Sequence, residues 1–512
     1  MNFLPKRFLL LSLVAVFMLV FAAACGGGTA EQPEEAPAAE EGTEAEAPAE
    51  EGTTDEEMPM EEETPAEEEG TTDEEMPMEE ETPAEEEGAT DEEEAPAAAG
   101  DASLDSPPSV PNAEEASQYT GASIVYYGGT TGLEAEIDDA LVAQFTEDTG
   151  IEVEIVRRPQ SPTDTINQYQ QLLANQSPDL DVIMLDVIWP GLLADNLLDL
   201  GPALGDVASE HIPSIVENST IDGKLVGIPW FTDWGMLYYR TDLLEKYGYD
   251  GPPATWDELE EMSQAVQEGE RGEGNDNFYG FVWQGNANES LTCNALEWVY
   301  SHGGGRFIDD GGAFTFDNEA TVTALTRAQG WVGTISPDGV TTYGEEEARP
   351  VFEDGNALFM RNWPYAYATG LQSGIADDFA VAPLPSVDGE QKAGTLGGWG
   401  LGISQYSENP EAAIEFVRYV TSPEVLKWRA LVGTYAPTNE AVLADPEVLE
   451  ALPYLEVLDQ IEVVARPSGE TGANYNEVST TIFQNVNQIL RGQDAVQLAP
   501  RVNEQLQQAA ER

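Results

Sequence analysis

Five short segments of the chain place an aromatic side chain beside a polar or glycine residue, at points where strands are expected to end. A sugar ring has apolar C–H faces that lie flat on aromatic rings, and hydroxyls that need fixed hydrogen-bond partners. A carboxylate can accept two such hydroxyls. The combination therefore favours carbohydrate binding. The segments are residues 186–189 (DVIW), 230–234 (WFTDW), 283–285 (WQG), 362–365 (NWPY) and 397–399 (GGW).

Each of these residues also has a plain structural interpretation. A Trp in a large body is more often a core residue than a binding platform, and an Asp after a strand is commonly a turn or cap residue. Both interpretations stay open for every single residue. The recurrence of the combination at five strand ends is what favours a sugar site.

The elements that would position these residues begin with alternating strands and helices. Apolar runs and four-residue periodicity predict a parallel α/β arrangement with helices on both faces of the sheet. Ligands of such sheets bind outside the carboxyl ends of the strands, where residues 128–134 and Asp186 lie. The predicted elements are strands at 124–127, 151–155 and 182–185, and helices at 133–150 and 166–173.

Later segments continue the same style. Thr255 and Glu258 form a capping box for a helix to about Gln267, and Asp317 is expected to cap a helix at 318–332. A strand at 357–360 and a helix at 410–420 follow. One sheet of ordinary size would not use this many units, so the body is predicted to form two α/β lobes.

Composition excludes several classes of function. The 512 residues contain 97 Asp and Glu against 20 Lys and Arg, for a formal charge of −77. This balance argues against binding to nucleic acid or to an anionic lipid surface. Two cysteines and two histidines leave little for zinc or iron–sulfur sites, so no metal and no cofactor is expected. His211 and His302 are interpreted as surface residues.

The N-terminus resembles a bacterial lipoprotein signal. Lys6 and Arg7 precede an apolar run at 8–24, and Cys25 follows three alanines. We expect 1–24 to be a signal peptide, Cys25 to be lipid-modified, and the body to lie outside the cytoplasm at the membrane. An uncleaved membrane anchor is the alternative. Cys293 is then interpreted as a small buried residue.

Residues 25–118 are predicted to form an acidic, disordered tether. Positions 26–118 carry 35 Asp and Glu with no Lys or Arg, and the 18 residues at 51–68 are repeated without change at 69–86. Each repeat offers only two Met as apolar residues, so the repeats have no core to stack. A solvated spacer is the preferred interpretation, with calcium capture or partner binding as alternatives.

The body at about 123–512 resembles solute-binding lipoproteins of ABC sugar importers, and most closely the trehalose/maltose-binding branch. The resemblance rests on long stretches in the family's order: 227–253 (GIPWFTDWGMLYYRTDLLEKYGYDGPP), 280–293 (GFVWQGNANESLTC), 361–366 (RNWPYA) and 381–404, which contains VAPLP and TLGGWGLGIS. It implies a class II periplasmic-binding-protein-like fold, with a ligand cleft between two lobes joined by hinge strands. The implied lobes are about 119–229 with 384–437, and about 230–383 with 438–512.

The same resemblance implies eight ligand contacts. They are an acidic loop residue, Glu134 (or Glu136); a strand-end carboxylate, Asp186; an inter-lobe pair, Phe231 and Asp233; a stacking wall, Trp363 and Tyr365; and a capping turn, Gly398 and Trp399. Relatives often have Tyr where Phe231 stands.

Two arginines that contact sugar in that branch have no clear equivalents. The segment 163–171 offers Gln168 or Tyr169, and 436–439 contains no Arg. Arg157 and Arg158 are candidates to compensate, with a surface or ion-pair role as the alternative. These departures leave the identity of the sugar open.

The implied function is capture of a sugar, such as the disaccharides trehalose or maltose, by lobe closure, and delivery to the permease subunits of an ABC importer. The protein would act as a monomer, and it would not be an enzyme. The alternatives are a secreted glycoside hydrolase with two carboxylates flanking the scissile bond, a ligand sensor for a signalling receptor, and a clamp for a non-sugar solute.

Overall fold

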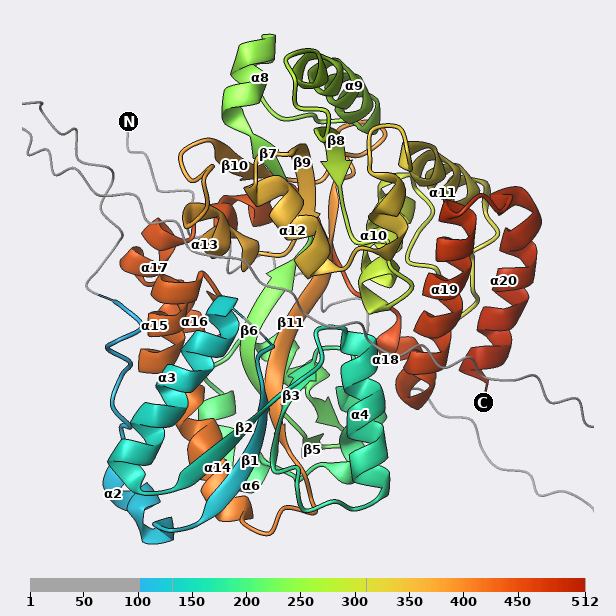
Figure 1. Cartoon of the computed structure of the whole chain (residues 1–512). Coiled ribbons are helices and arrows are strands. Elements are labelled where there is room, and N and C mark those ends of the chain that lie inside the picture. The colour runs from blue at the N-terminus through green and yellow to red at the C-terminus, as the bar shows by residue number, and fades with distance from the viewer. Residues whose placement is uncertain (1–101, 131, 310, 512) are drawn as a thin grey trace, which may run out of the picture. The chain divides into compact units, whose positions relative to one another are not determined.

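Two β-sheets organise the part of the chain that the computed structural model describes, which is residues 102–130, 132–309 and 311–511. The predicted signal peptide, Cys25 and the acidic repeats lie outside these residues. The end of the predicted disordered tether does not: residues 102–118 pack on the body, where the Tyr419 hydroxyl donates to the Pro108 carbonyl at 2.7 Å and the Trp428 indole to that of Ser103 at 3.0 Å. In the described part the larger sheet has seven strands and the smaller sheet has four. The larger sheet lies in the lower half of Figure 1 and the smaller sheet in the upper half.

The larger sheet contains the parallel unit that the sequence predicts. Its order is β12-β6-β11-β3-β1-β2, and β13 pairs with β11 off this path. β1 is parallel to β2 and β3, whereas β11 is antiparallel to β3 and β6. The strands are β1 (Ser123–Gly128), β2 (Glu152–Arg157), β3 (Val182–Asp186), β6 (Ile228–Trp234), β11 (Ala393–Ile403), β12 (Ala436–Pro437) and β13 (Glu462–Val464).

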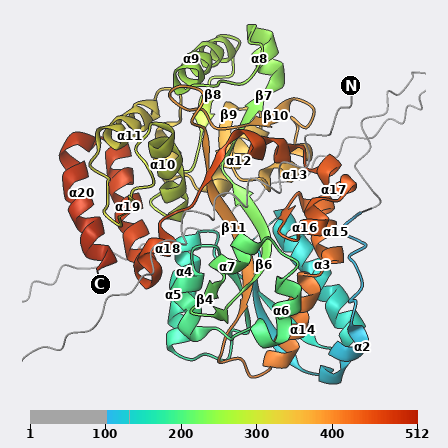
Figure 2. The ribbon, with the colours of Figure 1, turned by 180° about the vertical axis from the view of Figure 1, so that it is seen from behind.

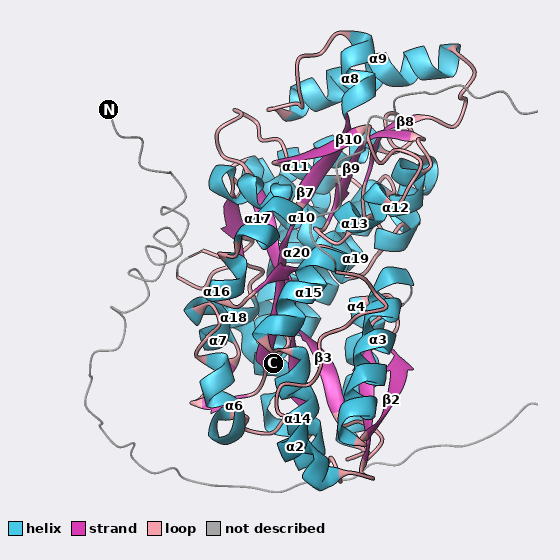
Figure 3. Cartoon of the chain, turned by 90° about the vertical axis from the view of Figure 1, so that its left-hand side faces the viewer, coloured by secondary structure: helices cyan, strands magenta, loops and turns pink. Residues whose placement is uncertain are grey.

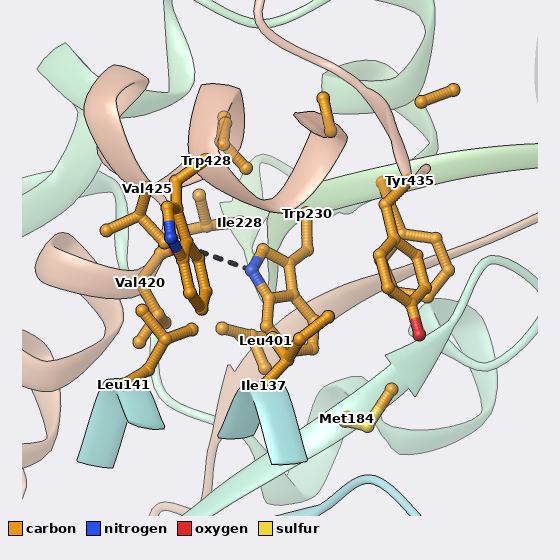
Figure 4. Packing of buried hydrophobic residues seen from close by; sticks show 14 of the residues in the cluster. Ile137, Leu141, Met184, Ile228, Trp230, Leu401, Val420, Val425, Trp428 and Tyr435 are labelled. Atoms are coloured by element: carbon orange, nitrogen blue, oxygen red, sulfur yellow. Dashed lines mark hydrogen bonds between the residues drawn. The ribbon is translucent and has the colours of Figure 1, made fainter. Parts of the chain in front are cut away.

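Apolar clusters cover both faces of this sheet, because neighbouring residues of a strand point to opposite sides. Tyr126 belongs to one cluster and Tyr127 to the other. Figure 4 shows the first cluster around Trp230, whose indole nitrogen donates a hydrogen bond of 3.0 Å to the carbonyl of Val420. This cluster includes residues of α3 (Gly132–Thr149), α14 (Pro410–Val420) and α15 (Pro423–Gly433). The cluster on the other face, to which Tyr127 belongs, includes residues of α4 (Pro162–Ala174) and α5 (Pro190–Leu193).

The smaller sheet has the order β10-β7-β9-β8. Its strands are β7 (Met236–Arg240), β8 (Tyr279–Val282), β9 (Ala357–Asn362) and β10 (Phe379–Ala382). A second apolar core joins it to α8 (Thr241–Tyr247), α9 (Trp256–Gly272), α10 (Glu289–Ser301), α11 (Glu319–Trp331), α19 (Tyr475–Leu490) and α20 (Ala495–Ala510). The first cluster also extends to this sheet, and it includes residues of α12 (Glu345–Glu353) and α13 (Ala366–Leu371).

Each sheet with its helices forms a lobe, here named the large-sheet lobe and the small-sheet lobe. Figure 3 shows α8 and α9 at one end of the molecule and α2 (Ala113–Ala116) and α6 (Gly201–Ala208) towards the other. The large-sheet lobe also contains α7 (Pro213–Asn218), α16 (Glu440–Leu443) and a two-stranded ribbon formed by β4 (Thr220–Ile221) and β5 (Lys224–Leu225). Helix α17 (Pro446–Ala451) packs on α15 and α16.

Strands connect the two lobes. β6 of the larger sheet is followed by β7 of the smaller sheet, with only Gly235 between them. β11 pairs with β6 and β3 in the large-sheet lobe and with β13 at its other end. In Figures 1 and 2, β6 and β11 run side by side from one half of the molecule to the other. This is the two-lobed α/β fold of class II that the sequence predicts.

Local predictions hold with small differences. The capping box of Thr255 and Glu258 is confirmed. Helix α11 begins one residue later than expected, because Asn318 rather than Asp317 is its N-cap and accepts a hydrogen bond from the Thr321 backbone. Among the described residues, none of the helices combines the length and apolar character that a membrane span needs.

Candidate functional site

A cavity of about 690 Å³ lies between the two lobes. Strand ends and loops of the large-sheet lobe form one wall, and α10, α12 and the segment after β9 form the other. The structure brings all eight ligand residues expected from the sequence, and the alternative Glu136, to this one cavity. They are Glu134, Asp186, Phe231, Asp233, Trp363, Tyr365, Gly398 and Trp399.

Glu134 lies in the first turn of α3, where its carboxylate closes the preceding loop. It accepts a hydrogen bond of 2.9 Å from the Thr130 backbone. Arg158, which is 9% exposed, reaches the same carboxylate with an Nη2–Oε1 distance of 3.2 Å. The Arg158 guanidinium also lies 4.5 Å from the ring centroid of Trp399. Glu134 thus enters the cavity with a partner that fixes its direction.

Asp186 ends β3 and belongs to a buried network that crosses the cleft. Its Oδ1 accepts hydrogen bonds from the Ile188 backbone at 3.3 Å and from Arg466 Nη2 at 3.1 Å. Arg466 Nη1 donates at 3.0 Å to Glu289, the first residue of α10 in the small-sheet lobe. Tyr475 and Ser479 also donate to Glu289. Burial raises the pKa of both carboxyls, and Arg466 opposes that increase.

Asp233 differs from its neighbours because it has no cationic partner in contact. It lies on β6, is 7% exposed, and its Oδ1 has no hydrogen-bond partner among the described residues. Burial raises the pKa of its carboxyl to about 7, and the Asp186 carboxylate adds to the increase. Two residues earlier on β6, the ring of Phe231 lies 4.8 Å from that of Tyr435, which also lines the cavity.

Trp363 and Tyr365 follow β9 and are held by acids of α12. The Trp363 indole donates to Glu345 at 3.1 Å, and the Tyr365 hydroxyl donates to Glu346 at 2.7 Å. Both rings are half-buried and line the cavity. The aromatic wall is therefore oriented by hydrogen bonds to acids that line the same cavity, as well as by packing.

The turn at Gly398 needs glycine for two reasons. Its φ is +121°, and an added Cβ would lie 2.6 Å from the carbonyl oxygen of Phe231. The following residue, Trp399, packs edge-on against Trp189 with 5.2 Å between ring centroids. The Gly-Gly-Trp sequence thus lets β11 approach β6 closely while it directs an indole to the cavity.

Sequence reasoning missed several cavity residues. Arg466 lies between β13 and α18 (Ser468–Thr471), and its partner Asp186 is 280 positions away in the chain. Glu289 and Glu345 each follow a Gly or Asn and read locally as the start of a helix. Of the two candidate arginines, Arg158 lines the cavity, whereas Arg157 pairs with Asp139 outside it.

Two further interpretations can be compared with the structure. Cys293 is a buried free thiol, as expected.

The interpretation of His211 as a surface residue is wrong. His211 is 1% exposed, its Nδ1 contacts the Thr438 hydroxyl at 2.8 Å, and burial lowers the pKa of its ring to about 4. His302 is half-buried and contacts the Trp298 carbonyl. In the described residues no cluster of His, Cys, Asp or Glu is arranged to hold a metal ion.

Comparison with known proteins gives the family. Residues 130–427, more than half of the chain, match the family model of bacterial extracellular solute-binding proteins. The chain belongs to this family. A protein of Deinococcus radiodurans described as a probable ABC transporter-binding protein is 46% identical over 356 residues, which cover 69% of this chain and 84% of the relative.

A further relative resembles the chain in sequence, and a solved structure resembles it in both sequence and fold. The maltotriose-binding protein of Pyrococcus abyssi is 27% identical over 290 residues, covering 54% of this chain and 58% of the relative. The solved structure of maltose-bound T. maritima MalE3 is 39% identical, with a TM-score of 0.71 over 76% of this chain and 99% of that chain. These are solute-binding proteins, so the chain is a binding protein and not an enzyme.

Proposed function

We propose that this solute-binding protein captures a sugar between its two lobes. The observation that carries the proposal is the make-up of the cavity: Asp186 and Asp233 face a half-buried aromatic wall of Trp363 and Tyr365 across the inter-lobe gap. Carboxylates suit hydroxyls and aromatic rings suit C–H faces. A purely apolar solute would leave the buried Asp233 carboxylate with an unpartnered oxygen, which costs about 1–3 kcal/mol or more.

A disaccharide such as maltose or trehalose is the proposed ligand. MalE3, at 39% identity, holds maltose, and the P. abyssi relative is named for maltotriose. Phe231 stands where a phenol was expected, and Tyr435 beside it supplies a hydroxyl in the same wall. Arg158 and Arg466 line the cavity, and we propose that they take the place of the two arginines that contact sugar in the trehalose/maltose-binding branch.

The proposed mechanism is a two-state clamp. The sugar contacts both lobes, so it binds the closed form better than the open form. A shift of the closed fraction from 1% to 99% needs about 5.5 kcal/mol of differential binding. Hydrogen bonds from hydroxyls to charged groups contribute about 1.5–3 kcal/mol each, so two or three of them, together with ring burial, are sufficient.

Delivery to the permease of an ABC importer and a lipid anchor at Cys25 complete the proposal. Residues 25–101 would act as the spacer between membrane and body, with residues 1–24 as the removed signal, because residues 102–118 pack on the body and bury Val110 and Ala116. The lobes expected from the sequence are about 119–229 with 384–437, and about 230–383 with 438–512; because α16 packs on α15 and β12 of the large-sheet lobe, we place the last crossing after Leu443. Because β6 continues to Trp234, we place the first crossing nearer Gly235.

Isothermal titration calorimetry tests this function. The protein is titrated with trehalose, maltose, sucrose, maltotriose and glucose, beside its Asp233→Ala and Trp363→Ala variants. We expect saturable binding of at least one disaccharide, weakened by roughly 30-fold or more in each variant. Binding of none of the five sugars would refute the sugar assignment while leaving the family and fold intact.

A further inference from the structure

A fully buried ion pair lies directly behind the aromatic wall of the cavity. Arg361 on β9 is 0% exposed and Glu297 on α10 is 1% exposed. The two side chains form a bidentate contact, with 2.9 Å from Nε to Oε2 and 2.5 Å from Nη2 to Oε1. Neither residue lines the cavity. The pair therefore has no direct access to a solute, and its role has to be found in what it touches.

The Glu297 carboxylate connects the pair to the strands that join the lobes. Its Oε1 also accepts a hydrogen bond of 3.0 Å from the backbone of Thr395 on β11. At Gly235, between β6 and β7, an added Cβ would lie 1.9 Å from the same oxygen and 2.6 Å from Arg361 Nη2. The backbone of both crossing segments is thus packed against this one ion pair.

The Arg361 guanidinium connects the pair to the sugar wall. Its Cζ lies 4.0 Å from the ring centroid of Trp363, two residues further along the chain. A flat guanidinium held by two hydrogen bonds presents a fixed planar surface to an indole. Gln284 holds the other side, because its Oε1 is 3.3 Å from Arg361 Nη1 and its Nε2 donates to the Arg361 carbonyl at 2.9 Å.

Stabilisation of the fold does not by itself explain why two charged side chains are buried here. Desolvation of two charges offsets most of their attraction, and well-packed apolar residues often replace buried ion pairs without loss. The contacts of this pair instead fix the positions of the Trp363 ring and of the Thr395 backbone. We infer that the Arg361–Glu297 ion pair is a positioning unit, which fixes the Trp363 ring and anchors it to the segments that join the lobes. The inference deepens the proposed sugar site and rests on it for its functional meaning.

The first test needs no ligand. The near-ultraviolet circular dichroism spectrum of the protein minus that of its Trp363→Phe variant isolates the signal of this indole. The same difference is measured in the background Arg361→Met with Glu297→Gln, in which the new amide oxygen can still accept from Thr395. We expect the amplitude to fall by roughly half or more there. It should persist in the matched background Arg240→Met with Asp242→Asn, which removes an ion pair between β7 and α8 that lies outside the cavity wall.

The second test measures coupling to binding. In the wild type, Trp363→Ala should weaken sugar binding roughly 30-fold. In the Arg361→Met, Glu297→Gln background the same substitution should weaken it no more than about fivefold, because the ring is no longer held. If the paired variant does not fold, Arg361→Lys serves in both tests, since it keeps the charge but not the planar group.

The outcomes separate the two proposals. An unchanged Trp363 difference spectrum, or equal effects of Trp363→Ala in both backgrounds, would overturn the positioning role. A wild type that binds no sugar would overturn the proposed function, and the dichroism result would still decide whether Arg361 holds the ring.

Discussion

At the scale of single residues, the cavity holds several buried or half-buried carboxyls, which differ in whether a cation neutralises their charge. Glu134 has Arg158, and Asp186 and Glu289 share Arg466. Asp233 has an unpartnered oxygen among the described residues. A buried acid without a partner destabilises its own fold, so Asp233 is better explained by a ligand than by packing.

The first prediction concerns Asp233→Asn and pH. The pKa of about 7 exceeds the unfolded value, so the folded protein binds more protons than the unfolded chain and loses stability as pH rises towards 7. The variant lacks this loss. Its stability relative to wild type should therefore increase by roughly 2–3 kcal/mol between pH 5 and pH 8.

Urea unfolding without sugar at pH 5 and pH 8 checks this expectation. Asp459→Asn, at an exposed position, is the control and should show no such change. An Asp233→Asn effect that is equal at the two pH values would mean that Asp233 does not carry the expected proton.

The second prediction concerns Gly235→Ala. The new Cβ would collide with Glu297 Oε1, so the backbone or the ion pair must move, and we expect a loss of about 3 kcal/mol or more. Gly205, inside α6, has no atom within 4 Å of an added Cβ. Gly205→Ala should therefore be neutral or stabilise by up to about 1 kcal/mol. Equal unfolding free energies for the two variants would contradict this account of the crossing.

At the scale of elements, the sequence predicts the unit from β1 to β3 well, because its periodic patterns are local. The sequence places Glu134 and Asp186 beyond the carboxyl ends of these strands, where a ligand is expected, and both residues line the cavity. Contacts between distant segments leave no such pattern. Arg466 and Asp186 are 280 positions apart, and His211 and Thr438 are 227 positions apart, so both contacts depend on the tertiary fold.

The third prediction concerns the network that joins β3, α10 and the segment after β13. Arg466→Met leaves Asp186 and Glu289 buried without a cation, which should cost about 3–5 kcal/mol near neutral pH. The loss should shrink as pH falls, because both carboxyls then bind protons.

Denaturant unfolding at pH 5 and pH 7.5 measures the effect. Arg327→Met removes pairs with Asp257 and Glu260, of which the first is 81% exposed, and should cost at most about 1 kcal/mol. A loss for Arg466→Met as small as that of the control would show that the network does not hold these elements together.

At the scale of the whole molecule, two lobes are joined by strands and share part of one apolar cluster, and the proposed solute lies between them. Each lobe can remain rigid while the crossing segments adjust. Direct contacts also cross the cleft, such as the hydrogen bond of 3.0 Å from the Glu289 backbone to the Thr163 hydroxyl. A solute that contacts both walls therefore changes the balance between open and closed forms.

The most direct test is the distance between the lobes in solution. Spin labels at Glu217→Cys and Glu268→Cys, both exposed and one in each lobe, report it by electron–electron double resonance in a Cys25→Ser background. We predict that one disaccharide shortens and narrows the distance distribution, and that Asp233→Ala abolishes the change. A distribution that stays the same with a sugar shown to bind would contradict capture by lobe closure.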